Sequence, residues 1–283
     1  MNYRHVFHAG NFADVHKHVV LTRILDYLRQ KPAPFRVIDS HAGAGLYDLT
    51  GPEAERSGEW RAGAGPVFDA LRTGALAAAA RVLLQPYFDV LSTLNPDGRL
   101  RSYPGSPLIA AALLRGGDRL IACEPVPQAA TTLKASLRGE ARAKVLTIDG
   151  WMAVNANVPP KERRGLVVID PPYESSDDFF RLTESLAVAH RKWPGGIYML
   201  WYPIKTREAA DALARRLRRL SVPKILRSEI SLDYPRAERG LVGSGLILVN
   251  PPYVLEHELQ IIGPALSQML ATRAAPGLSW LTP

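Results

Sequence analysis

A Pro-Pro-Tyr tripeptide occurs twice in the chain, each time directly after an apolar run. LVVID at residues 166–170 continues into the copy at 171–173, and LILVN at 246–250 continues into the copy at 251–253. An Asp or Asn followed by Pro-Pro and an aromatic residue at a strand end is the active-site signature of enzymes that methylate exocyclic amino groups. The surroundings of each copy must decide which one could do this chemistry.

The residue types of the first copy suit methyl transfer to an aromatic amine. The lone pair of such an amine is delocalised into the ring, so the nitrogen needs hydrogen-bond acceptors while it rehybridises and attacks. The Asp170 carboxylate and the Pro171 carbonyl, held rigid by two prolines, would be those acceptors. Asp170 would also stabilise the developing positive charge, and Tyr173 would stack on a flipped-out base. The predicted catalytic residues are therefore Asp170, Pro171 and Tyr173.

Strand-like and helix-like segments alternate along most of the chain. Candidate strands lie within 35–45, 119–125, 143–150, 165–173, 196–203, 224–232 and 244–250. Helical periodicity covers 11–30, 107–116, 126–139, 177–192 and 206–220. Such alternation favours a doubly wound, mostly parallel sheet of seven strands.

The links before the two motifs differ in length. Helix-length segments flank the strand that ends at Asp170, so this strand should be parallel and should end at the ligand-binding edge of the sheet. The link 233–243 is only about eleven residues long and has no apolar stripe, which favours antiparallel pairing of the last strand. Asn250 would then lie at the opposite edge. An antiparallel last strand is the arrangement of Rossmann-like class I methyltransferases that use S-adenosylmethionine (AdoMet).

Residues 46–104 interrupt the alternation, because they are Ala-rich and contain no clear strand. In nucleotide-binding βαβ units, an acidic residue that binds ribose lies about 20 residues beyond the Gly-rich turn. Without this segment, Glu124 lies about 19 positions beyond Gly105, close to that spacing. We therefore predict a small helical insertion at 46–104 in one domain formed by 1–45 and 105–283.

The sequence HAGAG at 41–45 would let the backbone approach the cofactor closely, although it replaces the commoner acidic and Gly-rich pattern. By comparison with the nucleotide-binding βαβ unit, the Glu124 carboxylate would bind the ribose hydroxyls of the cofactor. Asp149 and Gly150 would lie at the amino edge of the cofactor's adenine. We therefore expect AdoMet as the cofactor.

The composition limits the class of protein and its partners. The chain has 283 residues, a net charge of +8, a pI near 9.7 and one cysteine, Cys123. The basic clusters at 161–165 and 212–227 favour a surface that faces nucleic acid. A single cysteine excludes an intramolecular disulfide framework and suits a reducing cytosol. Since we find no secretory signal and no long apolar span, we expect a cytoplasmic protein with no membrane association.

Five longer segments are distinctive: YRHVFHAGNFADVHKHVVL at 3–21, IDSHAGAGLYDL at 38–49, YPGSPLIA at 103–110, ERRGLVVIDPPYE at 162–174 and GIYMLWYPI at 196–204. Together they resemble the RlmJ family of bacterial 23S ribosomal RNA adenine-N6 methyltransferases. The resemblance covers essentially the whole chain, the insertion included. It implies that a specific adenine of 23S rRNA, protein-free or in an early assembly intermediate, is methylated. Because no extra apolar element is left unexplained, we expect the protein to be a monomer.

The resemblance also implies roles for individual residues. The cofactor-binding positions would be His18, His41, Ser106, Glu124, Asp149, Gly150 and Asp170. The substrate-binding positions would be Tyr3, Arg4, His5, Lys17 and Tyr173. No metal is implied, because the histidines near the N-terminus lack the spacing of a known metal motif.

Other functions remain open at this stage. The same motif occurs in DNA adenine-N6 methyltransferases, and rRNA guanine-N2 methyltransferases use similar motifs. A catalytically silent RNA-binding or ribosome-assembly factor could share the fold. An NAD-dependent dehydrogenase is disfavoured by the antiparallel last strand and by the lack of a recognisable set of residues for hydride transfer.

Overall fold

A computed structural model describes residues 4–233 and 240–283 and contains one eight-stranded sheet in the order β10-β8-β9-β7-β6-β1-β4-β5. The strands are β1 (Arg36–Asp39), β4 (Arg119–Cys123), β5 (Ala143–Leu146), β6 (Gly165–Ile169), β7 (Ile197–Ile204), β8 (Ile225–Ser231), β9 (Gly243–Val249) and β10 (Gly277–Thr282). The strands β5, β4, β1, β6 and β7 pair in parallel, whereas β9 is antiparallel to both β7 and β8. The predicted Rossmann-like fold with an antiparallel strand at 244–250 is confirmed.

The predicted number of strands was one too low, because β10 adds an eighth strand at the edge of the sheet. It pairs antiparallel with β8, and Lys224 N donates to Pro283 O at 2.8 Å. Its side chains are mostly half-exposed or exposed, so its sequence carries no strong apolar alternation. The open edge of β8 provides the hydrogen bonds that hold it.

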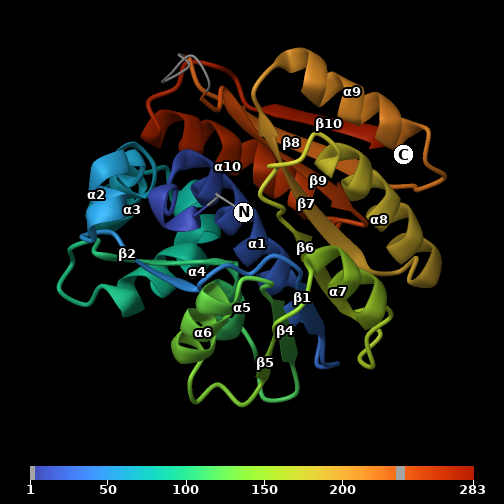
Figure 1. Ribbon diagram of the computed structural model, residues 1–283. Helices are drawn as coiled ribbons and strands as arrows, with labels where there is room; N and C mark the ends of the chain where they lie inside the picture. The colour runs from blue at the N-terminus through green and yellow to red at the C-terminus, as the bar shows by residue number, and fades with distance from the viewer. Residues whose placement is uncertain (1–3, 234–239) are drawn as a thin grey trace.

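Helices cover both faces of the sheet, as Figure 1 shows. The helices α7 (Gly150–Asn157), α8 (Asp178–Lys192) and α9 (Arg207–Arg218) pack on one face through side chains such as Ile38, Ile169 and Leu200. The other face carries α1 (Phe12–Arg29), α5 (Ser106–Ala112), α6 (Pro127–Ser136) and α10 (Leu255–Met269). The result is a three-layer α/β/α arrangement.

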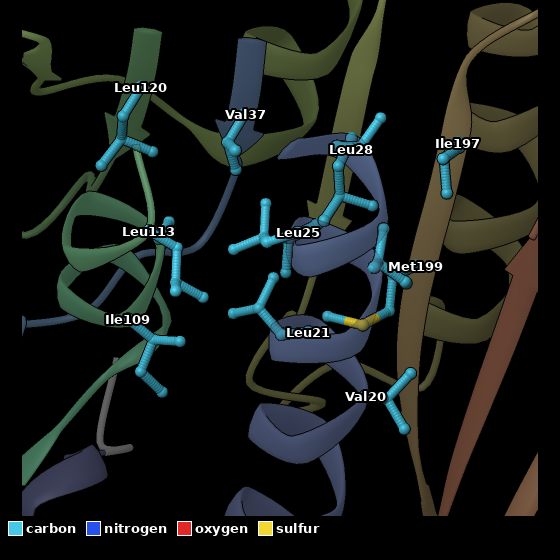
Figure 2. Close-up of a cluster of buried hydrophobic side chains, with 14 of the residues drawn as sticks. Val20, Leu21, Leu25, Leu28, Val37, Ile109, Leu113, Leu120, Ile197 and Met199 are labelled. Carbon is cyan, nitrogen blue, oxygen red and sulfur yellow. The ribbon is translucent and has the colours of Figure 1, made fainter. Parts of the chain in front are cut away.

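The first helix, α1, lies at the centre of its layer. Asn11 caps it by accepting a hydrogen bond from Asp14 N at 2.9 Å. Figure 2 shows Leu21, Leu25 and Leu28 among apolar side chains of α5 and the strands. Unlike an ordinary amphipathic surface helix, α1 is buried on its polar side as well.

Residues 46–104 form mainly helices, with a short antiparallel ribbon at their base. They contain β2 (Leu46–Asp48), α2 (Pro52–Ser57), η2 (Glu59–Ala62), α3 (Ala64–Thr73), α4 (Ala78–Leu94) and β3 (Ser102–Pro104). The ribbon corrects the expectation that no strand lies here. Gly105 N donates to Gly45 O at 2.6 Å, so the two ends of the insertion meet. The helices α3 and α4 share a core with α1 and α10. The separation of an insertion at 46–104 from a domain formed by 1–45 and 105–283 therefore stays a prediction. No described helix has the length and apolarity needed to span a bilayer.

His16 anchors α1 to the antiparallel end of the sheet. Its Nδ1 lies 3.1 Å from Ser244 Oγ of β9, and its Nε2 lies 3.0 Å from Ser228 Oγ of β8. The side chain is only 2% exposed, and burial lowers its pKa from 6.5 to about 3. Below pH 6.5 the His16 imidazole therefore binds a proton in the unfolded chain but not in the native protein. The free energy of unfolding falls as the pH falls.

We predict that His16→Gln reduces the loss of stability between pH 7 and pH 5 by about 2 kcal/mol relative to the unmodified protein. Gln can keep one of the two hydrogen bonds but does not titrate. The measurement is the free energy of unfolding by urea at both pH values. His18, His41 and Asp39 titrate in both proteins, so their contributions cancel in the comparison. An unchanged pH dependence would contradict this assignment.

Candidate active site

Five of the predicted site residues lie at the edge where the parallel strands end. Asp170 follows β6, Glu124 follows β4, and the turn that contains His41 follows β1. Asp149 and Gly150 lie where α7 begins. The second motif lies elsewhere, as predicted, since Asn250 Nδ2 donates to Pro194 O and Gly196 O, at 2.6 and 2.9 Å, just before β7 begins.

Asp170 is held by a buried polar chain from the start of the molecule. Lys17 Nζ donates to Asp170 Oδ2 and lies 2.9 Å from Asp14 Oδ1. Asp14 Oδ2 in turn accepts from His5 Nε2 and from Gly10 N, both at 3.0 Å. The side chains of Asp14, Lys17 and Asp170 are 3%, 5% and 14% exposed, so these charges are almost removed from water.

The opposite charges compensate for this burial. Burial by itself would lower the pKa of Lys17, but Asp14 and Asp170 raise it above its ordinary value. Burial would raise the pKa of Asp14, yet His5 and Lys17 hold it well below its ordinary value. Lys17 therefore stays an ammonium and Asp14 a carboxylate over the physiological pH range.

The ring of Tyr173 is fixed in place beside Asp170. Its hydroxyl donates to Trp201 O at 2.5 Å, and its ring centroid lies 5.5 Å from that of Trp201 and 5.0 Å from that of Phe179. Its φ of 52° is unusual for a residue with a side chain. Because the hydroxyl is already bonded, the ring face is the part of Tyr173 that can contact a ligand.

A cavity of about 610 Å³ opens beside this group. Its lining includes His5, Lys17, Asp170, Pro171 and Tyr173. These are catalytic and substrate-binding positions from the sequence, brought together from α1, the β6 loop and the N-terminal segment. Arg4 lies further out, 61% exposed and paired with Glu53 at 2.7 Å. Tyr3 lies outside the described residues.

The predicted cofactor residues lie around the turn after β1. Glu124 Oε2 accepts from Gly43 N at 3.1 Å, and its Oε1 accepts from Val126 N at 2.9 Å. Burial raises the pKa of Glu124 above its ordinary value. Asp149 accepts from Met152 N at 3.1 Å and thereby caps α7. Each carboxylate is oriented by backbone N–H groups and keeps lone pairs for a further partner.

Two histidines of the set are kept neutral by burial. His41 Nδ1 lies 2.8 Å from Ser40 Oγ, and burial lowers its pKa to about 4. His18 Nδ1 lies 2.9 Å from Tyr103 Oη, and burial lowers its pKa to about 3. Both side chains therefore act as uncharged hydrogen-bonding groups at neutral pH.

Asp39, at the end of β1, is a candidate that the sequence reasoning missed. It is fully buried, and neither of its carboxylate oxygens has a hydrogen-bond partner of good geometry. Burial raises its pKa to about 7, and the charge of Asp170 acts in the same direction, whereas Ser106 and Lys17 oppose the shift. The signal in the sequence was an acid at a strand end, two positions before His41.

The cofactor set fits AdoMet. An orphaned buried carboxylate needs a partner, and AdoMet carries two cationic groups, its α-ammonium and its sulfonium. Asp39, Ser106 and the 41–45 turn would hold that portion, and Glu124 and Asp149 the nucleoside. Asp170 adjoins both halves of the site, because it lines the cavity and its charge affects Asp39 and His41. In the described part of the chain, no cluster of three or more metal-ligating side chains occurs.

Comparisons with known proteins show the family of this chain. A family model described as "Ribosomal RNA large subunit methyltransferase D, RlmJ" matches residues 32–282. The chain is 38% identical to ribosomal RNA large subunit methyltransferase J of Escherichia coli (strain K12), across 100% of this chain and 99% of that protein. The protein of that name from Haemophilus influenzae is 37% identical, with the same coverage. A Legionella pneumophila crystal structure has a TM-score of 0.86 at 33% identity, and the match covers 96% of this chain and 97% of that one.

Gly150 provides a test of the cofactor site. A Cβ here would lie 2.3 Å from Ser40 O and 2.5 Å from His41 Nε2. We predict that Gly150→Ala displaces the 41–45 turn and weakens AdoMet binding at least about tenfold, which is roughly 1.4 kcal/mol. Isothermal titration calorimetry measures this affinity. The control is Gly195→Ala, where a Cβ meets nothing within 4 Å. Equal affinities of the two variants would exclude AdoMet from this turn.

Proposed function

Because this chain belongs to the family described as ribosomal RNA large subunit methyltransferase RlmJ, we propose that it transfers a methyl group from AdoMet to the exocyclic N6 amine of an adenine in 23S rRNA. The observation that carries the proposal is the position of Asp170. It follows the parallel strand β6, lines the cavity with Pro171 and Tyr173, and adjoins the predicted cofactor turn.

Each residue of the motif has a defined task in this reaction. Lys17 engages Asp170 Oδ2, and we assign Oδ1 to the target amine. The Pro171 carbonyl is the second acceptor, so that both amine protons are bonded while the nitrogen attacks. The carboxylate lies where positive charge develops on the nitrogen. AdoMet, when bound, supplies the electrophilic methyl group.

The surrounding side chains position the base and exclude water. The fixed ring of Tyr173 offers a stacking face in the cavity. An adenine reaches this depth only when it leaves its own stack, so we propose that the base is flipped out. His5 and Asp14 hold the Lys17 ammonium, and the ammonium fixes the carboxylate before the substrate arrives.

The remaining parts of the proposal concern the substrate and its setting. The protein is basic, and the proposed reaction requires the target adenine to enter the cavity. We therefore propose that it acts on accessible, single-stranded rRNA, either protein-free or in an early assembly intermediate. We propose that the enzyme acts as a monomer in the cytoplasm. Incubation with protein-free 23S rRNA, assembled large subunits and DNA, followed by mapping of the methylated nucleoside, tests the substrate. Methylation of DNA alone, or of guanine N2, would overturn the proposal.

We predict that Asp170→Asn lowers kcat at least about 100-fold, because it removes the negative charge beside the amine while keeping the shape of the side chain. AdoMet affinity should change less than about threefold. Single-turnover transfer of radiolabelled methyl groups and calorimetric titration measure the two quantities. Asp177→Asn is the matched control, because Asp177 is exposed and its side chain does not cap α8. Turnover at the unmodified rate would remove Asp170 from the mechanism.

A further inference from the structure

A second, open pocket of about 570 Å³ adjoins the catalytic cavity. The two share His8, Ser57, Pro172, Tyr173 and Lys205, so they form one continuous depression beside the catalytic motif. The outer pocket is also lined by Arg4, Phe7 and Arg56. Its wall therefore includes the insertion helix α2, the 3-10 helix η1 (His5–Phe7) and the link between β7 and α9, and Figure 1 shows α2 at the margin of the insertion.

Positive charge dominates this outer pocket. Arg4, Arg56 and Lys205 line it, together with one acid, Glu174. Arg4 is paired with Glu53, but among the described residues neither Arg56 nor Lys205 forms an ion pair with an acid. Both are exposed, so their charges face the solvent-filled pocket. Such a group of cations beside a deep cavity attracts an anionic ligand.

Phe7 positions one of these cations. The Arg56 guanidinium carbon lies 4.8 Å from the Phe7 ring centroid, and that of Arg4 lies 5.6 Å from it. Stacking on an aromatic ring limits the rotamers of a long side chain and leaves its N–H groups free to donate at the rim. The Arg56 guanidinium is thereby prepared for a planar or tetrahedral oxyanion.

We propose that Arg56 and Lys205, with Phe7 holding the Arg56 guanidinium, bind the backbone phosphate of the RNA nucleotide next to the base in the catalytic cavity. This inference rests on the proposed function, because it takes the ligand of the cavity to be an RNA base. A base in the cavity carries its own backbone into the adjoining pocket, since the two are continuous across Tyr173. Phosphate contacts fix the register of the strand and carry no sequence information.

This assignment gives the insertion a direct part in substrate binding. Arg56 belongs to α2 of the insertion, whereas Lys205 follows β7 of the main sheet. The RNA backbone would therefore be bound both by the insertion and by the main domain. Loss of these contacts should weaken RNA binding without changing the chemistry at Asp170.

The test is the double variant Arg56→Gln/Lys205→Gln, measured for equilibrium binding to a protein-free 23S rRNA transcript at several salt concentrations. We expect the Kd and the KM for RNA to rise at least tenfold and the slope of log K against log salt to fall by about 1. The kcat at saturating RNA and the Kd for AdoMet should stay within about twofold. The matched control is Arg29→Gln/Lys31→Gln, which removes two exposed cations just before β1, at the opposite edge of the sheet.

The positioning role of Phe7 has its own readout. Phe7→Leu should raise the KM for RNA severalfold with kcat unchanged, and Phe7→Tyr, which keeps the ring, should restore it. If the double variant binds the transcript like the unmodified protein, with the same salt slope, while that protein still methylates adenine, the inference fails and the proposed function stands. If the unmodified protein neither binds nor methylates the transcript, both fail.

Discussion

The Lys17 ammonium is a buried positive charge that joins the first helix to the end of β6, and the candidate active site is arranged around it. Removal of one partner of a buried ion pair leaves an uncompensated charge and typically lowers the stability of the protein by about 3–5 kcal/mol. Asp14 and Asp170 share the ammonium, and His5 and Gly10 complete the hydrogen bonds of Asp14. The rotation of α1 about its axis and the orientation of the Asp170 carboxylate are thus set together.

A helix that carries buried charge on one side must be covered on that side as well as on its apolar side. The sheet and α5 cover the apolar side of α1, and the insertion and α10 share a core with its other residues. The hydrogen-bonded chain from His18 to Tyr103 and then to Tyr87 runs from α1 through β3 to α4. The insertion is therefore part of the wall that seats the predicted cofactor residue His18.

Asp170 stands between two environments with different requirements. On one side, Asp39 and His41 are buried groups whose neutral forms are favoured by loss of water. On the other side, the cavity continues past Tyr173 into an open pocket lined by cations. A small cofactor can be enclosed on the first side, whereas a polyanionic chain needs the open, positively charged second side.

The sequence alone predicted most of the strands and helices of the main sheet up to residue 250, and with them the edge at which Asp170 lies, but it did not predict α7 or α10. It separated Asp170 from Asn250, because link length decides whether a strand runs parallel or antiparallel. It assigned Glu124 from its spacing beyond the Gly-rich turn. Only the tertiary structure decided the partners of Lys17, the unpaired carboxylate of Asp39, the anchoring of His16 and the addition of β10. These depend on burial and on atoms brought together from distant segments, which local periodicity does not encode.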